Sequence, residues 1–214
     1  MTSNDYWVRW HSQYDDPQSP RSRRLAAVRR QLRGALDQAE EGPIRLISMC
    51  AGQGRDVLGV LADHSRSHDV LACLVELNPE LARDARESAA QLGLVNVQVV
   101  QGDASWTSAY AKHVPADIIL TCGVFGSVSR HDMKQMILEL PHLGGPQAIT
   151  IWTMEGNPPD KRPWIRDVFR EAGFEELAYE TAEGAVFGVG SARWTSDPLP
   201  FRPDVQMFVF RPRE

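Results

Sequence analysis

The chain has 214 residues, of which 43% are apolar and 24% charged, and its formal net charge is −5. This composition supplies enough apolar residues for a full hydrophobic core and excludes a disordered or fibrous chain. The negative charge argues against non-specific binding to nucleic acid, and no apolar run is long enough to cross a membrane.

The cysteines and the first residues bear on the cellular compartment. Cys50, Cys73 and Cys122 are scattered along the chain, as is typical of proteins from a reducing compartment. The first residues, MTSNDYWVRWH, contain no apolar secretory segment. We therefore expect a cytoplasmic protein with neither a membrane nor a nucleic acid as its partner.

Residues 1–42 are predicted to form an N-terminal lid or helical segment. Trp7, Trp10, His11 and Tyr14 recur at spacings of three and four, so a short helix would align them on one face. These side chains either pin the N-terminus to the body of the protein or close over a ligand, and the sequence leaves both readings open.

A longer helix is predicted over residues 22–40. Residues 21–33 hold six arginines and no acid, while Leu25, Val28, Leu32 and Leu36 recur at helical spacing. This pattern favours an amphipathic helix with a solvated basic face. The alternative is that part of this face binds a phosphate or a carboxylate.

The stretch IRLISMCAGQGRD, residues 44–56, organises the rest of the chain. A short apolar run predicts a buried strand, Ala51 to Gly54 make a small-residue turn, and a helix is predicted over residues 54–63. Glycines in such a turn let the backbone approach a nucleotide-like ligand, and the helix N-terminus offers unpaired N–H groups. Glu76 ends a second apolar run, where a carboxylate can accept both hydroxyls of a ribose.

The remaining elements continue an alternation of strands and helices. Because such alternation predicts a parallel sheet with helices on both faces, we expect an α/β fold. The predicted helices span residues 79–92, 130–140 and 163–172, and the predicted strands span residues 69–76, 95–100, 117–122, 148–154, 174–180 and 205–211. Residues 185–203, rich in Gly, Pro and Ser, are predicted to be a long loop between the last two strands.

Four short segments converge at the carboxyl ends of these strands, where open parallel sheets bind ligands. They are residues 51–55, Glu76, residues 102–104 and residues 122–124. This order of features resembles the small-molecule type of class I S-adenosylmethionine-dependent methyltransferases. The resemblance implies a doubly wound, mostly parallel seven-stranded sheet with a C-terminal antiparallel strand pair, in a Rossmann-like domain over residues 43–214.

The resemblance also implies a cofactor, S-adenosylmethionine, with S-adenosylhomocysteine as the product. In that family the glycine turn packs against the methionine part, the acid after the second strand binds the ribose, and the Gly-Asp pair contacts the adenine amine. The implied cofactor-binding residues are Ala51, Gly52, Gln53, Gly54, Arg55, Glu76, Leu77, Asp103, Ala104, Cys122 and Gly123. The chain departs from the family's acid-x-Gly-x-Gly-x-Gly pattern, because Ser48 replaces the acid and Cys50 the first glycine.

The implied reaction is in-line displacement at the sulfonium methyl by an oxygen, nitrogen or carbon atom of a small molecule. Aromatic side chains near the expected site, among them Phe125, Trp152 and Trp194, favour an apolar or ring-bearing acceptor. His131 and His11 are the candidate general bases. The sequence leaves open whether the protein is a homodimer.

Particular residues bear on other possible functions. His64 and His68 lie in a polar loop with no third ligand at a matching spacing, so no metal is expected. A nicotinamide-dependent oxidoreductase needs a third small residue where this chain has Val57. A protein that binds S-adenosylmethionine or S-adenosylhomocysteine without catalysis is the remaining alternative, because Ser48 and Cys50 alter the motif.

Overall fold

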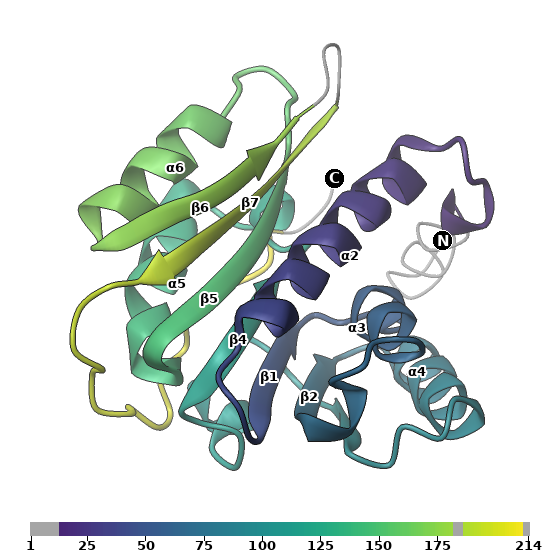
Figure 1. The fold of residues 1–214 in the computed structure, drawn as a ribbon. Coiled ribbons are helices and arrows are strands. Elements are labelled where there is room, and N and C mark those ends of the chain that lie inside the picture. The colour runs from purple at the N-terminus through teal and green to yellow at the C-terminus, as the bar shows by residue number, and fades with distance from the viewer. Residues whose placement is uncertain (1–12, 182–185, 212–214) are drawn as a thin grey trace.

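A computed structural model describes residues 13–181 and 186–211. Its strands form one seven-stranded sheet in the order β3-β2-β1-β4-β5-β7-β6 (Figure 1). Neighbouring strands from β3 to β5 run parallel, and β7 runs antiparallel to both β5 and β6. The strands are β1 (Ile44–Met49), β2 (Val70–Glu76), β3 (Val97–Gln101), β4 (Ala116–Thr121), β5 (Gly144–Glu155), β6 (Phe174–Glu180) and β7 (Phe187–Trp194). The predicted fold class is confirmed.

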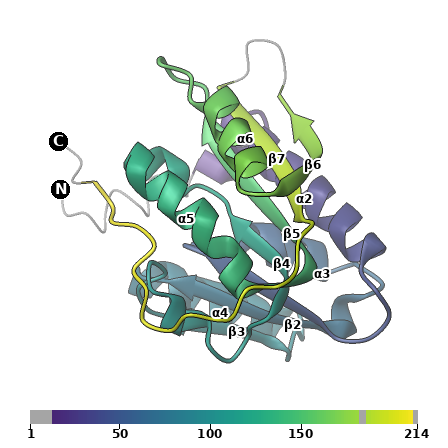
Figure 2. The ribbon, with the colours of Figure 1, turned by 90° about the vertical axis from the view of Figure 1, so that its left-hand side faces the viewer.

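Helices cover both faces of the sheet (Figures 1 and 2). They are α2 (Pro20–Gln38), α3 (Arg55–Leu61) and α4 (Pro79–Gln91) on one face, and α5 (Arg130–Leu143) and α6 (Arg162–Glu171) on the other. Short 3-10 turns complete the described part: η1 (Gln13–Asp15), η2 (Ser67–Asp69), η3 (Thr107–Tyr110) and η4 (Phe125–Ser127). None of the helices in the described ranges is long and apolar enough to span a membrane.

The central strands are buried on both faces, which explains their continuous apolar runs. Leu46 and Leu120 point into the core beneath α2 and α3, whereas Ile47, Met49 and Ile119 point into the core beneath α5 and α6. Each of these side chains is at most 1% exposed. The two cores hold the carboxyl ends of β1, β2 and β4 at one edge of the sheet.

The position of the last strand corrects the sequence prediction. The partner of β6 is Phe187–Trp194, within the predicted loop, and not residues 205–211. The glycines that suggested a loop are required by packing, since a Cβ at Gly190 would lie 2.4 Å from the Trp152 ring and one at Gly188 would lie 2.6 Å from the Tyr179 hydroxyl.

Residues 195–211, the C-terminal segment, take a second role that the sequence did not indicate. The third strand is followed by η3 and not by an α-helix, and the C-terminal segment packs at that position. The Thr107 hydroxyl donates to the Arg202 carbonyl (2.7 Å), and the Met207 amide donates to the Ser105 carbonyl (2.8 Å). Met207 and Phe208 are buried there (0% and 1% exposed). Figure 2 shows the segment as a yellow trace passing below α5.

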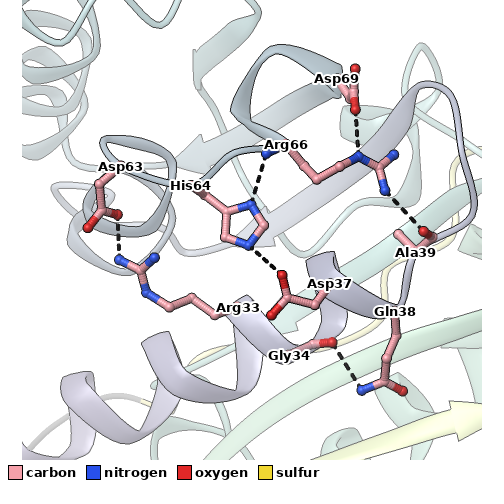
Figure 3. Close-up of polar contacts among 9 residues, drawn as sticks. All are labelled: Arg33, Gly34, Asp37, Gln38, Ala39, Asp63, His64, Arg66 and Asp69. Carbon is pink, nitrogen blue, oxygen red and sulfur yellow. Dashed lines mark hydrogen bonds and ion pairs between the residues drawn. The ribbon is translucent and has the colours of Figure 1, made fainter.

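Polar side chains fix the end of α2 against the segment before β2 (Figure 3). The Arg66 guanidinium donates to the carbonyls of Ala39 (3.0 Å), Glu40 (2.9 Å) and Gly42 (3.0 Å), which have no partner within the helix. His64 Nδ1 accepts from the Arg66 amide (3.1 Å), so Nε2 carries the proton that faces Asp37 Oδ1 (3.2 Å). Both ring nitrogens of His64 therefore have protein partners.

Several arginines of α2 contact other elements, which corrects the prediction that they form only a solvated basic face. Arg30 pairs with Glu180 (2.6 Å), and Arg29 Nε donates to the Arg55 carbonyl (3.0 Å). A Cβ at Gly59 would lie 2.1 Å from the Arg29 guanidinium, so this glycine lets Arg29 cross α3. The Arg30 pair joins α2 to the end of β6, and the Arg29 contacts hold α2 over the start of α3.

Candidate cofactor site

The turn after β1 has a backbone that favours glycine. Cys50, Gly52 and Gly54 all lie in the left-handed region, with φ values of 53°, 57° and 66°. The Ala51 amide donates to the Val75 carbonyl (3.0 Å), and the Gly54 amide donates to the Ala51 carbonyl (2.8 Å). A left-handed conformation costs a residue with a Cβ about 1 kcal/mol, which Cys50 bears in place of the family's first glycine.

Glu76 links the end of β2 to this turn. Its side chain is 8% exposed; Oε2 accepts from the Gly52 amide (2.7 Å) and Oε1 from the Asn78 amide (2.7 Å). Burial raises the pKa of the Glu76 carboxyl, and the backbone amides of Asn78, Gly52 and Leu77 partly oppose that rise. The two oxygens together have about four lone-pair sites, so the carboxylate keeps capacity for a further donor.

The end of β3 lies beside the end of β2. The Gly102 amide donates to the Glu76 carbonyl (3.0 Å), which places Asp103 and the buried Ala104 next to the Glu76 backbone. Asp103 is exposed, and its Oδ1 accepts from the Ser105 amide (2.9 Å). Leu77 is 60% exposed on the same edge. The structure therefore brings the predicted ribose and adenine residues together.

The side chains of Gln53 and Arg55 bind other parts of the protein. Gln53 Nε2 donates to Asp84 of α4 (3.0 Å), and Arg55 Nε donates to Gln53 Oε1 (2.7 Å). Arg55 Nη2 also pairs with Asp15 of η1 (2.9 Å), and its guanidinium lies 5.6 Å from the centre of the Tyr14 ring. These two residues tie the turn to α4 and to the segment before α2.

A polar group that the sequence reading missed lies near Cys122, at the end of β4. Arg24 is only 7% exposed and donates to the Tyr14 hydroxyl (2.6 Å). Burial raises the pKa of the Asp56 carboxyl, and the positive charges of Arg29 and Arg24 oppose that rise. Burial also raises the pKa of the Cys122 thiol, and the negative charge of Asp56 raises it further. The charges of Arg24 and Asp56 therefore both act on the Cys122 thiol.

The sequence did contain a signal for Arg24. Arg24 and Gln31 share the helical stripe of the buried residues Val28, Leu32 and Ala35, at spacings of three and four. A cation within an apolar stripe is rarely buried without a partner or a function. Periodicity would have separated Arg24 from Arg23, Arg29, Arg30 and Arg33 of α2.

The candidate general bases are not placed among these groups. His131 is exposed in the first turn of α5 and takes no part in the hydrogen bonds that join Gly52, Glu76 and Asn78. It follows the loop that starts at Gly123, so it lies toward the same edge of the sheet. His11 is outside the described residues. Within residues 13–181 and 186–211, no group of three or more His, Cys, Asp or Glu side chains could hold a metal ion.

The aromatic residues expected to face an acceptor belong to the core. Phe125 and Trp152 are 0% and 2% exposed, and their ring centroids lie 6.2 Å apart. The Trp152 ring stacks on Phe169 of α6 at 5.8 Å, and Trp194 is 6% exposed against Phe174. These rings pack α6 against the sheet, so they are not evidence for an apolar or ring-bearing acceptor.

Gly123 and Cys122 complete the predicted set at the end of β4. Gly123 has a φ of 83°, and its amide donates to the Thr153 hydroxyl of β5 (2.8 Å). Cys122 is partly buried, with its thiol directed to the Ile151 carbonyl (3.8 Å). These contacts join the carboxyl ends of β4 and β5, at the same edge of the sheet as the glycine turn after β1.

Solved structures share this fold. The carbon methyltransferase CurJ aligns with a TM-score of 0.63 at 16% identity, over 80% of this chain and 54% of that one. Magnesium protoporphyrin IX methyltransferase (ChlM) from Synechocystis PCC 6803, solved with bound SAM, gives 0.67 at 14% identity, over 90% and 95%. An O-methyltransferase family protein from Burkholderia thailandensis gives 0.60 at 15% identity, over 90% and 70%.

No protein-family model and no curated protein sequence matches the chain. The similarity therefore lies in the strand order and the positions of the helices. The chain has the class I methyltransferase fold, including the antiparallel β7 between β5 and β6.

Proposed function

We propose that this protein is an S-adenosylmethionine-dependent methyltransferase that acts on a small molecule. The observation that carries the proposal is the bond between Gly52 and Glu76, which joins a glycine turn to a buried carboxylate at the carboxyl edge of the sheet. A buried carboxylate with free lone pairs suits the two hydroxyls of a ribose, which donate hydrogen bonds. Asp103 lies beside it and suits the adenine amine, as the family resemblance implies.

The methionine part of the cofactor needs groups that the altered motif does not supply at Ser48. Arg24 and Asp56 suit this part, because a guanidinium matches a carboxylate and a carboxylate matches an ammonium group. Both lie near Cys122, at the end of the strand next to β1. We assign the cofactor's carboxylate to Arg24 and its ammonium to Asp56, in place of the family's acid.

When bound, S-adenosylmethionine supplies a sulfonium methyl, to which the acceptor's lone pair bonds as the carbon–sulfur electron pair returns to sulfur. The protein's own contribution is to align the two molecules and to exclude water. If the acceptor carries a proton at its reacting atom, His131 or His11 is the proposed base, with water as the final proton carrier.

The test is calorimetric titration of the purified protein with S-adenosylhomocysteine, with NADH as the control ligand. We expect micromolar binding of S-adenosylhomocysteine alone. Glu76→Gln keeps the shape of the side chain but removes its charge, and should weaken binding by about tenfold to a hundredfold. The matched control is Glu80→Gln on the exposed side of α4, which should leave the affinity unchanged.

Two results would reject the proposal. One is a folded protein that does not bind S-adenosylhomocysteine. The other is an unchanged affinity in Glu76→Gln, which would show that the end of β2 does not hold the ribose. Turnover is then tested with a labelled methyl donor and a panel of small acceptors.

A further inference from the structure

Three cations lie at the carboxyl edge of the sheet, the same edge as the candidate site. Arg130 begins α5 after the loop that follows Gly123, and Lys161 directly precedes α6. Arg211 comes from the C-terminal segment, whose residue Phe210 bridges to Val128. The three residues belong to segments far apart in the sequence.

Specific contacts hold these segments together. The Arg211 amide donates to the Ser127 carbonyl (2.9 Å), at the end of the turn η4 that leads into α5. The Arg130 guanidinium lies 4.3 Å from the centre of the Trp164 ring, within the first turn of α6 that follows Lys161. Arg130 is thus held against α6 by a cation–π contact, while a backbone hydrogen bond joins Arg211 to the η4 turn that leads into α5.

The electrostatics agree with this placement. Partial burial lowers the pKa of the Lys161 ammonium, and the positive charges of Arg211 and Arg130 lower it further. Because like charges repel, this arrangement of three cations is unfavourable unless an anion binds to it.

The acid that directly precedes Lys161 is already paired with a cation. Asp160 binds the Arg162 guanidinium through both carboxylate oxygens (2.9 Å and 3.1 Å to Nε), and Glu155 accepts from the Asn157 amide (3.2 Å). Among the ion pairs of residues 13–181 and 186–211, none includes Arg130, Lys161 or Arg211.

We infer that Arg130, Lys161 and Arg211 form the acceptor-binding site and that the acceptor is an anion, carrying a carboxylate or a phosphate. This inference rests on the proposed methyltransferase function, because the loop from Gly123 to Arg130 leads from the proposed cofactor site to these cations. Two guanidinium groups bind oxyanions by paired hydrogen bonds, and an ammonium adds a point charge. His131, next to Arg130, would then lie beside the bound acceptor.

The experiment uses the full chain saturated with S-adenosylhomocysteine. Binding of three probes is measured by ligand-observed NMR titration: benzoate, phenyl phosphate and the neutral benzamide. The two anions distinguish a carboxylate from a phosphate, and benzamide measures the contribution of the ring alone. We expect at least one anion to bind about tenfold more tightly than benzamide.

Variants locate the binding. Arg130→Gln combined with Lys161→Gln should weaken the anion by about tenfold or more and leave the affinity for S-adenosylhomocysteine unchanged. The matched control is Arg45→Gln combined with Lys112→Gln, which also removes two cations but from the cavity at the amino ends of β1 to β3. Arg130→Lys should retain part of the affinity, since it keeps the charge.

The outcomes separate the two proposals. If S-adenosylhomocysteine binds but neither anion binds more tightly than benzamide, the anionic acceptor is rejected and the methyltransferase proposal stands. Equal weakening by the Arg130/Lys161 and Arg45/Lys112 variants would also reject it. If S-adenosylhomocysteine does not bind, the methyltransferase proposal fails and the acceptor site fails with it.

Discussion

The two sides of the proposed site are built in different ways. On the cofactor side, residues 50–54 form a turn that leads into α3, and Glu76 and Asp103 follow at the ends of the next two strands. On the acceptor side, Arg130, Lys161 and Arg211 come from three distant segments, held by the contacts of Ser127 and Trp164. The first is specified by local sequence, whereas the second depends on how the C-terminal half packs.

This difference implies different responses to mutation. Damage to β7 or to the C-terminal segment should destabilise the protein and disturb the acceptor side, while the glycine turn keeps its local hydrogen bonds. Damage within the turn should change cofactor affinity with smaller effects on stability. Three substitutions test this comparison, beginning with the largest expected effect.

Gly190→Ala should destabilise the protein by about 3 kcal/mol, at the upper end of the cost of overpacking a core. The new Cβ would lie 2.4 Å from the Trp152 ring, which is 2% exposed and stacked on Phe169. The ring has no free side toward which it could move. Urea denaturation measures the loss.

The control for Gly190→Ala is Gly34→Ala in α2, where the nearest atom to the new Cβ is 4.0 Å away. It should stabilise the protein by up to about 1 kcal/mol, because alanine favours a helix. A neutral effect of Gly190→Ala would show that β7 does not lie as closely on Trp152 as described.

Much of the geometry of the proposed cofactor side could be predicted from the sequence, because most of its residues follow a strand end and a parallel sheet brings such ends together. The small-residue turn and Glu76 needed no knowledge of distant contacts. Arg24 was missed although its helical spacing marked it, since a run of arginines was interpreted as one surface. The roles of His131 and His11 stay predictions.

The C-terminal half could not be predicted in the same way. Gly188 and Gly190 resemble loop residues until Tyr179 and Trp152 are seen to fill the space beside them. Residues 205–211 alternate as a strand does, yet they make isolated bridges to Trp106 and Val128. Their partners lie far away in the sequence, so no local pattern could indicate them.

Arg202→Gln should destabilise the protein by about 2 kcal/mol, because it leaves the carboxylate of Glu139 without its cation. Glu139 is buried, with its side chain 3% exposed, and pairs with Arg202 of the C-terminal segment, which is about half exposed. A remaining hydrogen bond from Gln135 (3.2 Å) offsets part of the cost. Thermal and urea denaturation measure the change in unfolding free energy.

A double-mutant cycle isolates this pair. Adding Glu139→Gln to Arg202→Gln should restore part of the stability, since the buried charge is then removed. Arg170→Gln, which breaks an exposed pair with Asp167, should change stability by less than about 1 kcal/mol. Equal effects of Arg202→Gln and Arg170→Gln would mean that the C-terminal segment is not anchored through Glu139.

Asp56→Asn tests the cofactor side and should have the smallest effect on stability. Burial raises the pKa of Asp56 above its ordinary value of 3.8, so the folded state binds the proton more tightly than the unfolded state does. The contribution of Asp56 to the free energy of unfolding is therefore fully present below pH 3.8. It is lost as the pH rises through the raised pKa of the folded state. Asparagine cannot ionise and avoids this loss.

The variant should thus gain stability relative to the wild type as the pH rises from about 4 to about 8, measured by urea denaturation at each pH. Asp63→Asn is the control, because its exposed side chain pairs with Arg33 on the surface. Over the same range Asp56→Asn should bind S-adenosylhomocysteine more weakly, since it would no longer hold the ammonium group by charge. A gain in unfolding free energy together with a loss of affinity for S-adenosylhomocysteine would identify Asp56 as a group retained for binding, as residues of functional sites often are. A loss of stability at neutral pH with unchanged affinity would instead assign Asp56 to the start of α3 alone.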